Sequence, residues 1–187
     1  MCNQTISVRG FDRVGNQLSQ TALMNKLFKS LSVLALLICC AFGATAQLPG
    51  VQLKDLNGKT VDTATLSNDG NPFVISFFAT WCKPCQRELK AIADVYPDWQ
   101  DETGMKLIAV SVDDAQDTPE VKALVAAEGW EYDVLLDSNE DFKRAFGIQN
   151  IPHVLVFDGQ GNLIMSHSGY TEGGEHEIIE KIRSISE

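Results

Sequence analysis

The sequence predicts an α/β layer fold, and three observations support this prediction. Two runs of strand-forming apolar residues, 72–80 and 105–113, have the composition of strands buried on both faces. Apolar residues recur at helical spacing after Cys82, and a second helical segment follows Thr118. Strands that alternate with helices along a chain pack as a sheet covered by helices.

The first half of the folded region is expected to contain a hairpin, a buried strand and a long helix. Residues 51–56 and 60–66 flank a turn at 57–59, where Asn-Gly favours a β-hairpin. The buried strand at 72–80 comes next. The long helix starts near Cys82, and Pro97 marks a break or kink in it.

The second half is expected to continue the alternation. Thr118 as N-cap and Pro119 at the first helical position predict a helix that runs to about Glu128 and stops at Gly129. The remaining expected elements are a strand at 132–137, a short helix capped by Ser138 or Asn139 and ended by Gly147, two strands within 153–169 around a turn at 158–162, and a final helix over 171–184.

The N-terminal part of the chain has the layout of a secretory signal peptide at 24–46. A short basic segment precedes 12 apolar residues at 31–42, and small residues follow up to Ala46. Twelve residues are too few to span a bilayer comfortably, although a retained membrane anchor and a buried core helix remain alternatives. Residues 1–23 are a doubtful N-terminal extension, and 47–187 is expected to be one exported, periplasmic domain.

Charge and cysteine content restrict the function classes. Removal of 1–46 leaves 11 basic and 24 acidic residues and a net charge of −13, which argues against nucleic acid or an anionic membrane as partner. Only Cys82 and Cys85 remain, so no disulfide framework holds the domain together. The three histidines lack the spacing of a zinc site; we therefore expect no metal and no cofactor.

Cys82 and Cys85 stand between a buried strand and a helix, which favours a redox-active pair. A thiolate at the helix N-terminus is stabilised by free N–H groups and the helix dipole, and Lys83 adds a positive charge beside it. Pro84 fits the first turn, where its missing N–H costs nothing. Cys85, one turn on, can reach back to Cys82. A metal clip and a structural disulfide remain alternatives.

Three stretches, "FFATWCKPC", "IQNIPHVLVFDGQGNLI" and "LKDLNGKTVDTATL", resemble the thioredoxin superfamily, in particular its exported TlpA/ResA-like branch. The resemblance implies a thioredoxin-like fold: a central mixed β-sheet flanked by helices, with an N-terminal β-hairpin and an inserted helix and strand at 117–136. It also implies that Cys82 attacks, that Cys85 resolves, and that Pro152, after Ile151, is a cis-proline facing the disulfide. Apocytochrome c is a substrate that the resemblance implies.

Departures from the family pattern raise questions about proton transfer. Ser76 stands where cytosolic thioredoxins have a buried aspartate, and a hydroxyl cannot replace it as a base. Glu88 takes a position where some ResA-like proteins have an acidic residue. It either exchanges the proton of the resolving thiol or is an exposed helix glutamate. His153 replaces the usual threonine and either tunes the thiolate or points away from it.

The expected substrate-docking residues surround the cysteine pair. Trp81 either covers the sulfurs and contacts substrate or packs on the helix. Lys83, Pro84, Ile151 and His153 complete this set. The nearby acids at 113, 114 and 117 are expected to form a solvated loop.

The functional prediction is an exported thiol–disulfide oxidoreductase, most simply a reductase of protein disulfides. Its partners would be exported proteins bearing disulfides or thiols and a membrane electron donor, and the protein would be a monomer. A disulfide oxidase or isomerase, and a metal carrier using both cysteines and His153, remain alternatives. A thiol peroxidase is disfavoured because Ile75 and Ala79 occupy the positions where it would need proline and threonine.

Overall fold

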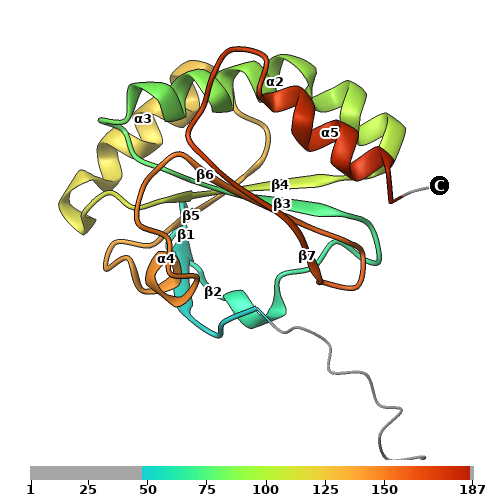
Figure 1. Cartoon of the computed structure of the whole chain (residues 1–187). Helices are drawn as coiled ribbons and strands as arrows, with labels where there is room; N and C mark the ends of the chain where they lie inside the picture. The colour runs from blue at the N-terminus through green and yellow to red at the C-terminus, as the bar shows by residue number, and fades with distance from the viewer. Residues whose placement is uncertain (1–47, 186–187) are drawn as a thin grey trace, which may run out of the picture. The chain divides into compact units, whose positions relative to one another are not determined.

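The computed structural model describes residues 48–185 as a seven-stranded sheet in the order β2-β1-β5-β4-β3-β6-β7 (Figure 1). Strands β3, β4 and β5 are parallel, whereas β1, β2, β6 and β7 pair antiparallel with their neighbours. The strands are β1 (Gln52–Asp55), β2 (Thr60–Asp62), β3 (Phe73–Phe78), β4 (Lys106–Ser111), β5 (Asp133–Leu136), β6 (His153–Phe157) and β7 (Leu163–Ser168). This mixed sheet confirms the predicted fold class.

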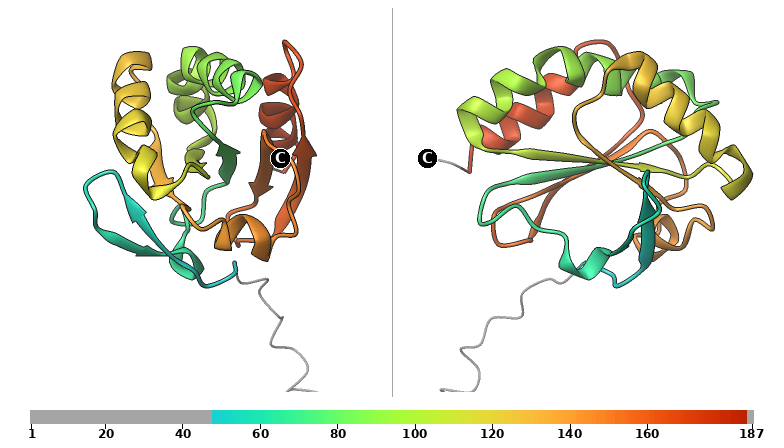
Figure 2. Two further views of the ribbon diagram at one scale, coloured as in Figure 1. Left: turned by 90° about the vertical axis from the view of Figure 1, so that its left-hand side faces the viewer. Right: turned by 180° about the vertical axis from the view of Figure 1, so that it is seen from behind.

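Helices cover both faces of the sheet. Figures 1 and 2 show α2, α3 and α5 over one face and the short α4 under the other. The helices are α2 (Lys83–Thr103), α3 (Thr118–Glu128), α4 (Asp141–Ala145) and α5 (Glu175–Arg183), with 3-10 turns η1 (Thr63–Thr65) and η2 (Ala115–Asp117). Among residues 48–185, no helix combines the length and apolar character needed to cross a membrane.

Strand β3, which lies between β4 and β6 in the sheet, is buried along its whole length because helices cover both faces of the sheet. Its alternating side chains therefore meet different layers. Ser76 contacts α2 through Glu88, whereas Phe77 packs against Phe142 of α4 with ring centroids 5.7 Å apart. This explains why the sequence shows a continuous apolar run there instead of alternation.

Helix α2 is one continuous helix of 21 residues, so of the break or kink expected at Pro97 the break is wrong. Pro97 lies on the exposed face, while Tyr96 and Trp99 on either side of it are buried. Burial of these aromatic rings offsets the hydrogen bond that proline cannot make. Arg183 of α5 makes two hydrogen bonds of 2.6 Å to the carboxylate of Glu102, which joins α5 to the end of α2.

Several predicted element ends are wrong. Thr118 is the first residue of α3 and not its N-cap, which is Asp117. Neither Ser138 nor Asn139 caps α4; the carboxylate of Asp137 accepts from the N–H groups at its start. The second hairpin strand ends at residue 62 instead of 66, and the last helix begins at 175 instead of 171.

The inserted segment is present as α3 and β5, between β4 and α4. Strand β5 joins β4 in parallel and β1 in antiparallel pairing, so it connects the N-terminal hairpin to the central sheet. Lys90 of α2 pairs with Glu128 of α3 at 3.4 Å, and the hydroxyl of Tyr132 donates to the carbonyl of Leu89. The insertion is therefore anchored to the helix that carries the cysteines.

The turn between β6 and β7 requires glycine at position 159. A Cβ atom there would lie 1.8 Å from the carbonyl oxygen of Gly70, a backbone atom that cannot rotate away. We expect Gly159→Ala to lower the free energy of unfolding by about 3 kcal/mol, as overpacking does in tight sites. Urea unfolding of both proteins measures the change. Gly50→Ala is the matched control, since its nearest neighbour would be 3.6 Å away; equal losses in both variants would contradict the steric reading.

Candidate active site

Cys82 and Cys85 form a disulfide at the start of α2, with their Cα atoms 5.3 Å apart. Cys82 is the N-cap of the helix, and its Sγ accepts a hydrogen bond of 3.3 Å from the N–H of Cys85. Only three residues, 79–81, separate Cys82 from the end of the buried strand β3, so this strand fixes the position of the helix N-terminus. A thiolate on Cys82 would be stabilised by the same N–H group and by the dipole of α2.

The two sulfurs differ in access to solvent. Cys82 is 5% exposed, whereas Cys85 is fully buried. An incoming disulfide can therefore reach only Cys82, and Cys85 is placed to attack afterwards from within the protein. The bond closes a loop of only a few residues, so it constrains the unfolded chain little. A structural role for this disulfide is correspondingly weak.

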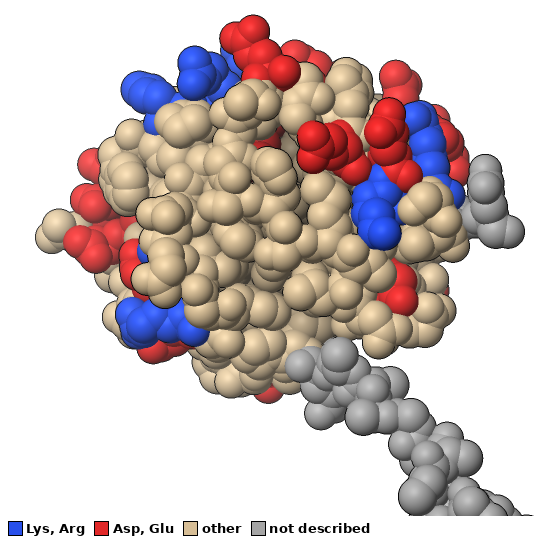
Figure 3. Space-filling view, in the orientation of Figure 1, with Lys and Arg blue, Asp and Glu red and all other residues tan. Residues whose placement is uncertain are grey.

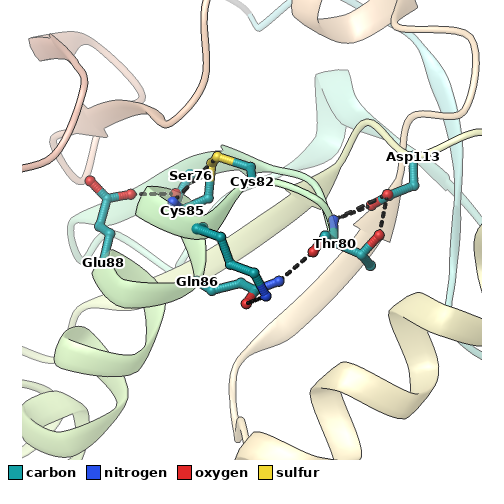
Figure 4. The surroundings of a disulfide bond; sticks show 8 residues. Ser76, Thr80, Cys82, Cys85, Gln86, Glu88 and Asp113 are labelled. Carbon is teal, nitrogen blue, oxygen red and sulfur yellow. Dashed lines mark hydrogen bonds between the residues drawn. A yellow bond between two sulfur atoms is a disulfide. The ribbon is translucent and has the colours of Figure 1, made fainter.

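Glu88 is buried one helical turn beyond Cys85, which excludes the exposed-glutamate alternative. Its Oε2 accepts a hydrogen bond of 3.1 Å from the hydroxyl of Ser76 on β3 (Figure 4). Burial raises the pKa of Glu88 to about 7; the Ser76 hydrogen bond opposes this shift, and the charge of Glu175 adds to it. A carboxyl group with this pKa can take or give a proton at neutral pH.

A second carboxyl group from α5 lies near Glu88. Glu175 is almost buried, and its Oε2 accepts a hydrogen bond of 2.8 Å from the hydroxyl of Tyr170. Its charge interacts with both Glu88 and Tyr170. The start of α5 therefore contributes to the electrostatics of the α2 face beside the cysteines.

The Ile151–Pro152 peptide bond is cis, and Pro152 is buried directly before β6. The register pairs His153 with Phe77, so Pro152 lies at the edge of the sheet where β3 leads into Cys82. The N–H of Gly169 donates to the carbonyl of Pro152 at 2.8 Å and fixes this loop to the end of β7. Sequence analysis placed Pro152 and Ile151 near the pair, and the topology brings them to the same edge.

His153 points away from the cysteine pair. It shares a face of the sheet with Phe77, which packs on α4, whereas the cysteines and Glu88 belong to α2. Its Nε2 lies 2.9 Å from the hydroxyl of Ser166, and burial lowers its pKa, with His167 adding to the effect. Within residues 48–185, no three His, Cys, Asp or Glu side chains cluster as a metal site.

The other expected docking residues lie around Cys82. Trp81 is 68% exposed, so it neither packs on the helix nor is covered by other residues. Lys83 is exposed, and its ammonium group lies 3.3 Å from the side-chain oxygen of Gln86. Pro84 occupies the first turn of α2 as expected. A large exposed indole beside a nearly buried sulfur offers an apolar contact for a polypeptide substrate.

Asp113 corrects the expectation of a solvated acidic loop. Asp114 is exposed, but Asp113 is only 3% exposed. Its carboxylate accepts hydrogen bonds from the backbone N–H and hydroxyl of Thr80 (Figure 4). It also accepts one from the hydroxyl of Ser111. The sequence held no signal for this, because three neighbouring acids at the end of a strand look alike.

Surface charge is mixed on the face shown in Figure 3. Lys and Arg side chains lie beside Asp and Glu at its periphery, and its centre is largely uncharged. Ion pairs on the surface include those of Lys106 with Asp133 at 2.7 Å and of Arg183 with Glu102 at 2.6 Å.

A cysteine pair at a helix N-terminus, beside a buried carboxyl group and at the sheet edge that carries a cis-proline, defines the class of thioredoxin-like thiol–disulfide oxidoreductases. The chain belongs to the AhpC/TSA family, whose sequence model matches residues 44–166.

Curated relatives and solved structures agree with this class. A protein of Halalkalibacterium halodurans named thiol-disulfide oxidoreductase ResA is 27% identical over 132 residues, which are 70% of this chain and 72% of the relative. The ResA of Bacillus subtilis is 25% identical over 174 residues, covering 84% and 94% of the two chains.

A thioredoxin-like protein from Porphyromonas gingivalis, solved in solution, is 60% identical with a TM-score of 0.68, covering 75% of this chain and 92% of its own. A putative thiol:disulfide interchange protein DsbE from Chlorobium tepidum, 20% identical with a TM-score of 0.64, covers 74% and 94% and shares the fold.

The raised pKa of Glu88 makes stability depend on pH. Because folding favours its protonated form, Glu88 contributes stability that is complete below its ordinary pKa of 4.5 and is lost as pH rises through about 7. We expect the wild-type protein to lose roughly 3 kcal/mol relative to Glu88→Gln between pH 4 and pH 8. Denaturant unfolding of the oxidised proteins measures this, since disulfide-bonded cysteines do not titrate.

The lowered pKa of His153 makes the free energy of unfolding rise with pH, opposite to the effect of Glu88. This contribution is the same in both proteins and cancels in their difference. Parallel pH curves for the wild-type protein and Glu88→Gln would contradict a raised pKa at Glu88.

Proposed function

We propose that this protein is an exported reductase of protein disulfides that works through the Cys82–Cys85 pair. The observation that carries the proposal is the asymmetry of the pair. One sulfur is slightly exposed at a helix N-terminus, and the other is fully buried one turn before a buried carboxyl group. This arrangement separates an attacking sulfur from a resolving one.

In the first step the Cys82 thiolate attacks one sulfur of a substrate disulfide. A Cys82–substrate disulfide forms, the substrate S–S bond breaks, and the other substrate sulfur leaves as a thiolate. The N–H of Cys85 and the dipole of α2 favour the thiolate on Cys82. Trp81, exposed beside Cys82, contacts the substrate chain, and the Ile151–Pro152 loop faces it from the same sheet edge.

In the second step Cys85 attacks Cys82. The Cys85 thiol gives its proton to Glu88, a Cys82–Cys85 disulfide forms, and the second substrate sulfur is released as a thiolate that then takes a proton. Two electrons have then passed from the cysteine pair to the substrate. Burial of Cys85 protects it from outside reagents until this step.

Export and the electron source belong to the same proposal. The residues expected to form the signal peptide, 24–46, lie outside the described residues. An exported reductase works in an oxidising compartment, so a membrane dithiol donor is needed to reduce Cys82–Cys85 after each turnover. An oxidase or isomerase would use the same sulfurs in the reverse direction, and the reduction potential distinguishes these functions.

The reduction potential of the pair is the first measurement. We expect a value near that of thioredoxin, about −270 mV, when the mature protein is equilibrated with dithiothreitol or glutathione buffers. A value near about −120 mV would make the protein a disulfide donor and reverse the direction. A pair that is reduced only when the domain unfolds would show that the disulfide is structural.

Single-cysteine variants test the assigned order of attack. Cys85→Ser is expected to accumulate a Cys82–substrate disulfide because the resolving step is lost, and turnover of a protein disulfide should fall at least about a hundredfold. Cys82→Ser should form no such adduct, since Cys85 is buried. Non-reducing gels after mixing with a disulfide-bonded protein show which variant is trapped; adducts on Cys85 would reverse the two roles.

A further inference from the structure

Asp113 is a buried carboxylate directly behind the loop that carries the cysteine pair. It follows β4, which pairs with β3, and the loop after β3 contains Thr80 and Cys82. The N–H of Thr80 lies 2.9 and 3.1 Å from its two oxygens, and the hydroxyl of Thr80 donates at 2.6 Å. The hydroxyl of Ser111 donates at 2.8 Å.

These contacts fix Thr80 from both sides. While Asp113 holds its N–H and hydroxyl, the side-chain amide of Gln86 on α2 donates to its carbonyl. The N–H of Cys82 donates to the carbonyl of Ala79 at 3.1 Å and closes the turn. The position of Cys82 at the helix N-terminus therefore depends on the hydrogen bonds that hold Thr80 between Asp113, after β4, and Gln86 of α2. We call these three residues the clamp.

The same contacts place an uncompensated negative charge near the pair. The carboxylate acts only as an acceptor toward three side-chain or backbone donors, as an ionised group does. Among residues 48–185, Asp113 takes part in no ion pair. Other charged side chains close to the pair in the sequence are the exposed Lys83 and Arg87 and the buried Glu88.

A fixed negative charge destabilises a nearby thiolate and leaves a disulfide unaffected. Oxidoreductases whose reduced form is stabilised are strong oxidants, so destabilising the reduced form makes a pair more reducing. Hydrogen bonds to Asp113 stabilise the carboxylate without neutralising it. Its net effect on the redox equilibrium is thus opposite to that of the helix dipole.

We propose that Asp113 is a positioning residue that fixes the loop from Thr80 to Cys82. Its negative charge also destabilises a thiolate on Cys82 and so makes the reduction potential of the pair more negative. This inference rests on the proposed redox function of the pair and goes beyond it, because it names a group that makes the reduction potential of the pair more negative.

Asp113→Asn tests the charge, because the amide keeps the shape and one acceptor oxygen. We expect the equilibrium with glutathione to shift about tenfold toward the reduced pair, which corresponds to a potential about 30 mV less negative. Asp114→Asn is the matched control, since it removes the same charge from the exposed neighbouring position; its equilibrium should change less than about twofold. An Asp113→Asn potential equal to or more negative than that of the wild-type protein overturns the proposal.

Thr80 variants test the clamp, and they test the positioning role of Asp113 if Asp113→Asn does not fold. Thr80→Val removes the hydroxyl that donates at 2.6 Å, and Thr80→Ser keeps it. We expect the rate constant of reduced protein with oxidised glutathione to fall about fivefold in Thr80→Val, the effect of one lost hydrogen bond, and to be restored in Thr80→Ser. Equal rates in both variants and the wild-type protein overturn the clamp.

The wild-type titration separates failure of this inference from failure of the proposed function. If the wild-type pair cannot be reduced in the folded protein, the redox function itself is wrong. If the wild-type pair titrates reversibly while Asp113→Asn and Thr80→Val match it, the function stands and the role of Asp113 is rejected.

Discussion

The hydrogen bond from the N–H of Cys85 to the sulfur of Cys82 depends on the junction where β3 ends and α2 begins. Since β3 is an inner strand that pairs with both β4 and β6, this junction has two fixed neighbours. Strand β4 brings Asp113 to it, and β6 brings Pro152. The other groups around the sulfurs are thus placed by strand pairing with β3.

Two buried carboxyl groups lie near the cysteine pair, and their hydrogen bonds give them different roles. Glu88 has one donor, the hydroxyl of Ser76, and burial raises its pKa to about 7. Such a group can exchange a proton during turnover. Asp113 has three donors and holds the loop before Cys82. One carboxyl group is suited to proton transfer and the other to fixing geometry and charge. Figure 4 shows the two side chains on either side of the disulfide.

Substrate contact and sulfur chemistry fall on different residues, because Trp81 is exposed and Cys85 is buried. The indole is 68% exposed, yet its chain neighbour Cys82 is 5% exposed. A polypeptide substrate can gain apolar contact area on Trp81 while only one sulfur comes within reach. Contacts of α2 with α3 and α5 support the helix that carries this site.

The sequence alone determined the fold class and the reactive pair, because both depend on local patterns: continuous apolar runs for buried strands and two cysteines at the start of a helix. Tertiary structure decided what local patterns cannot. Glu88 is buried because Ser76 on β3 lies opposite it, and strand alternation turns His153 to the α4 face. Asp113 differs from its exposed neighbour Asp114 only because Thr80, 33 residues earlier, meets it across the sheet edge. Burial and hydrogen bonding of a polar side chain depend on partners distant in the sequence, and these are defined only when the strands pair.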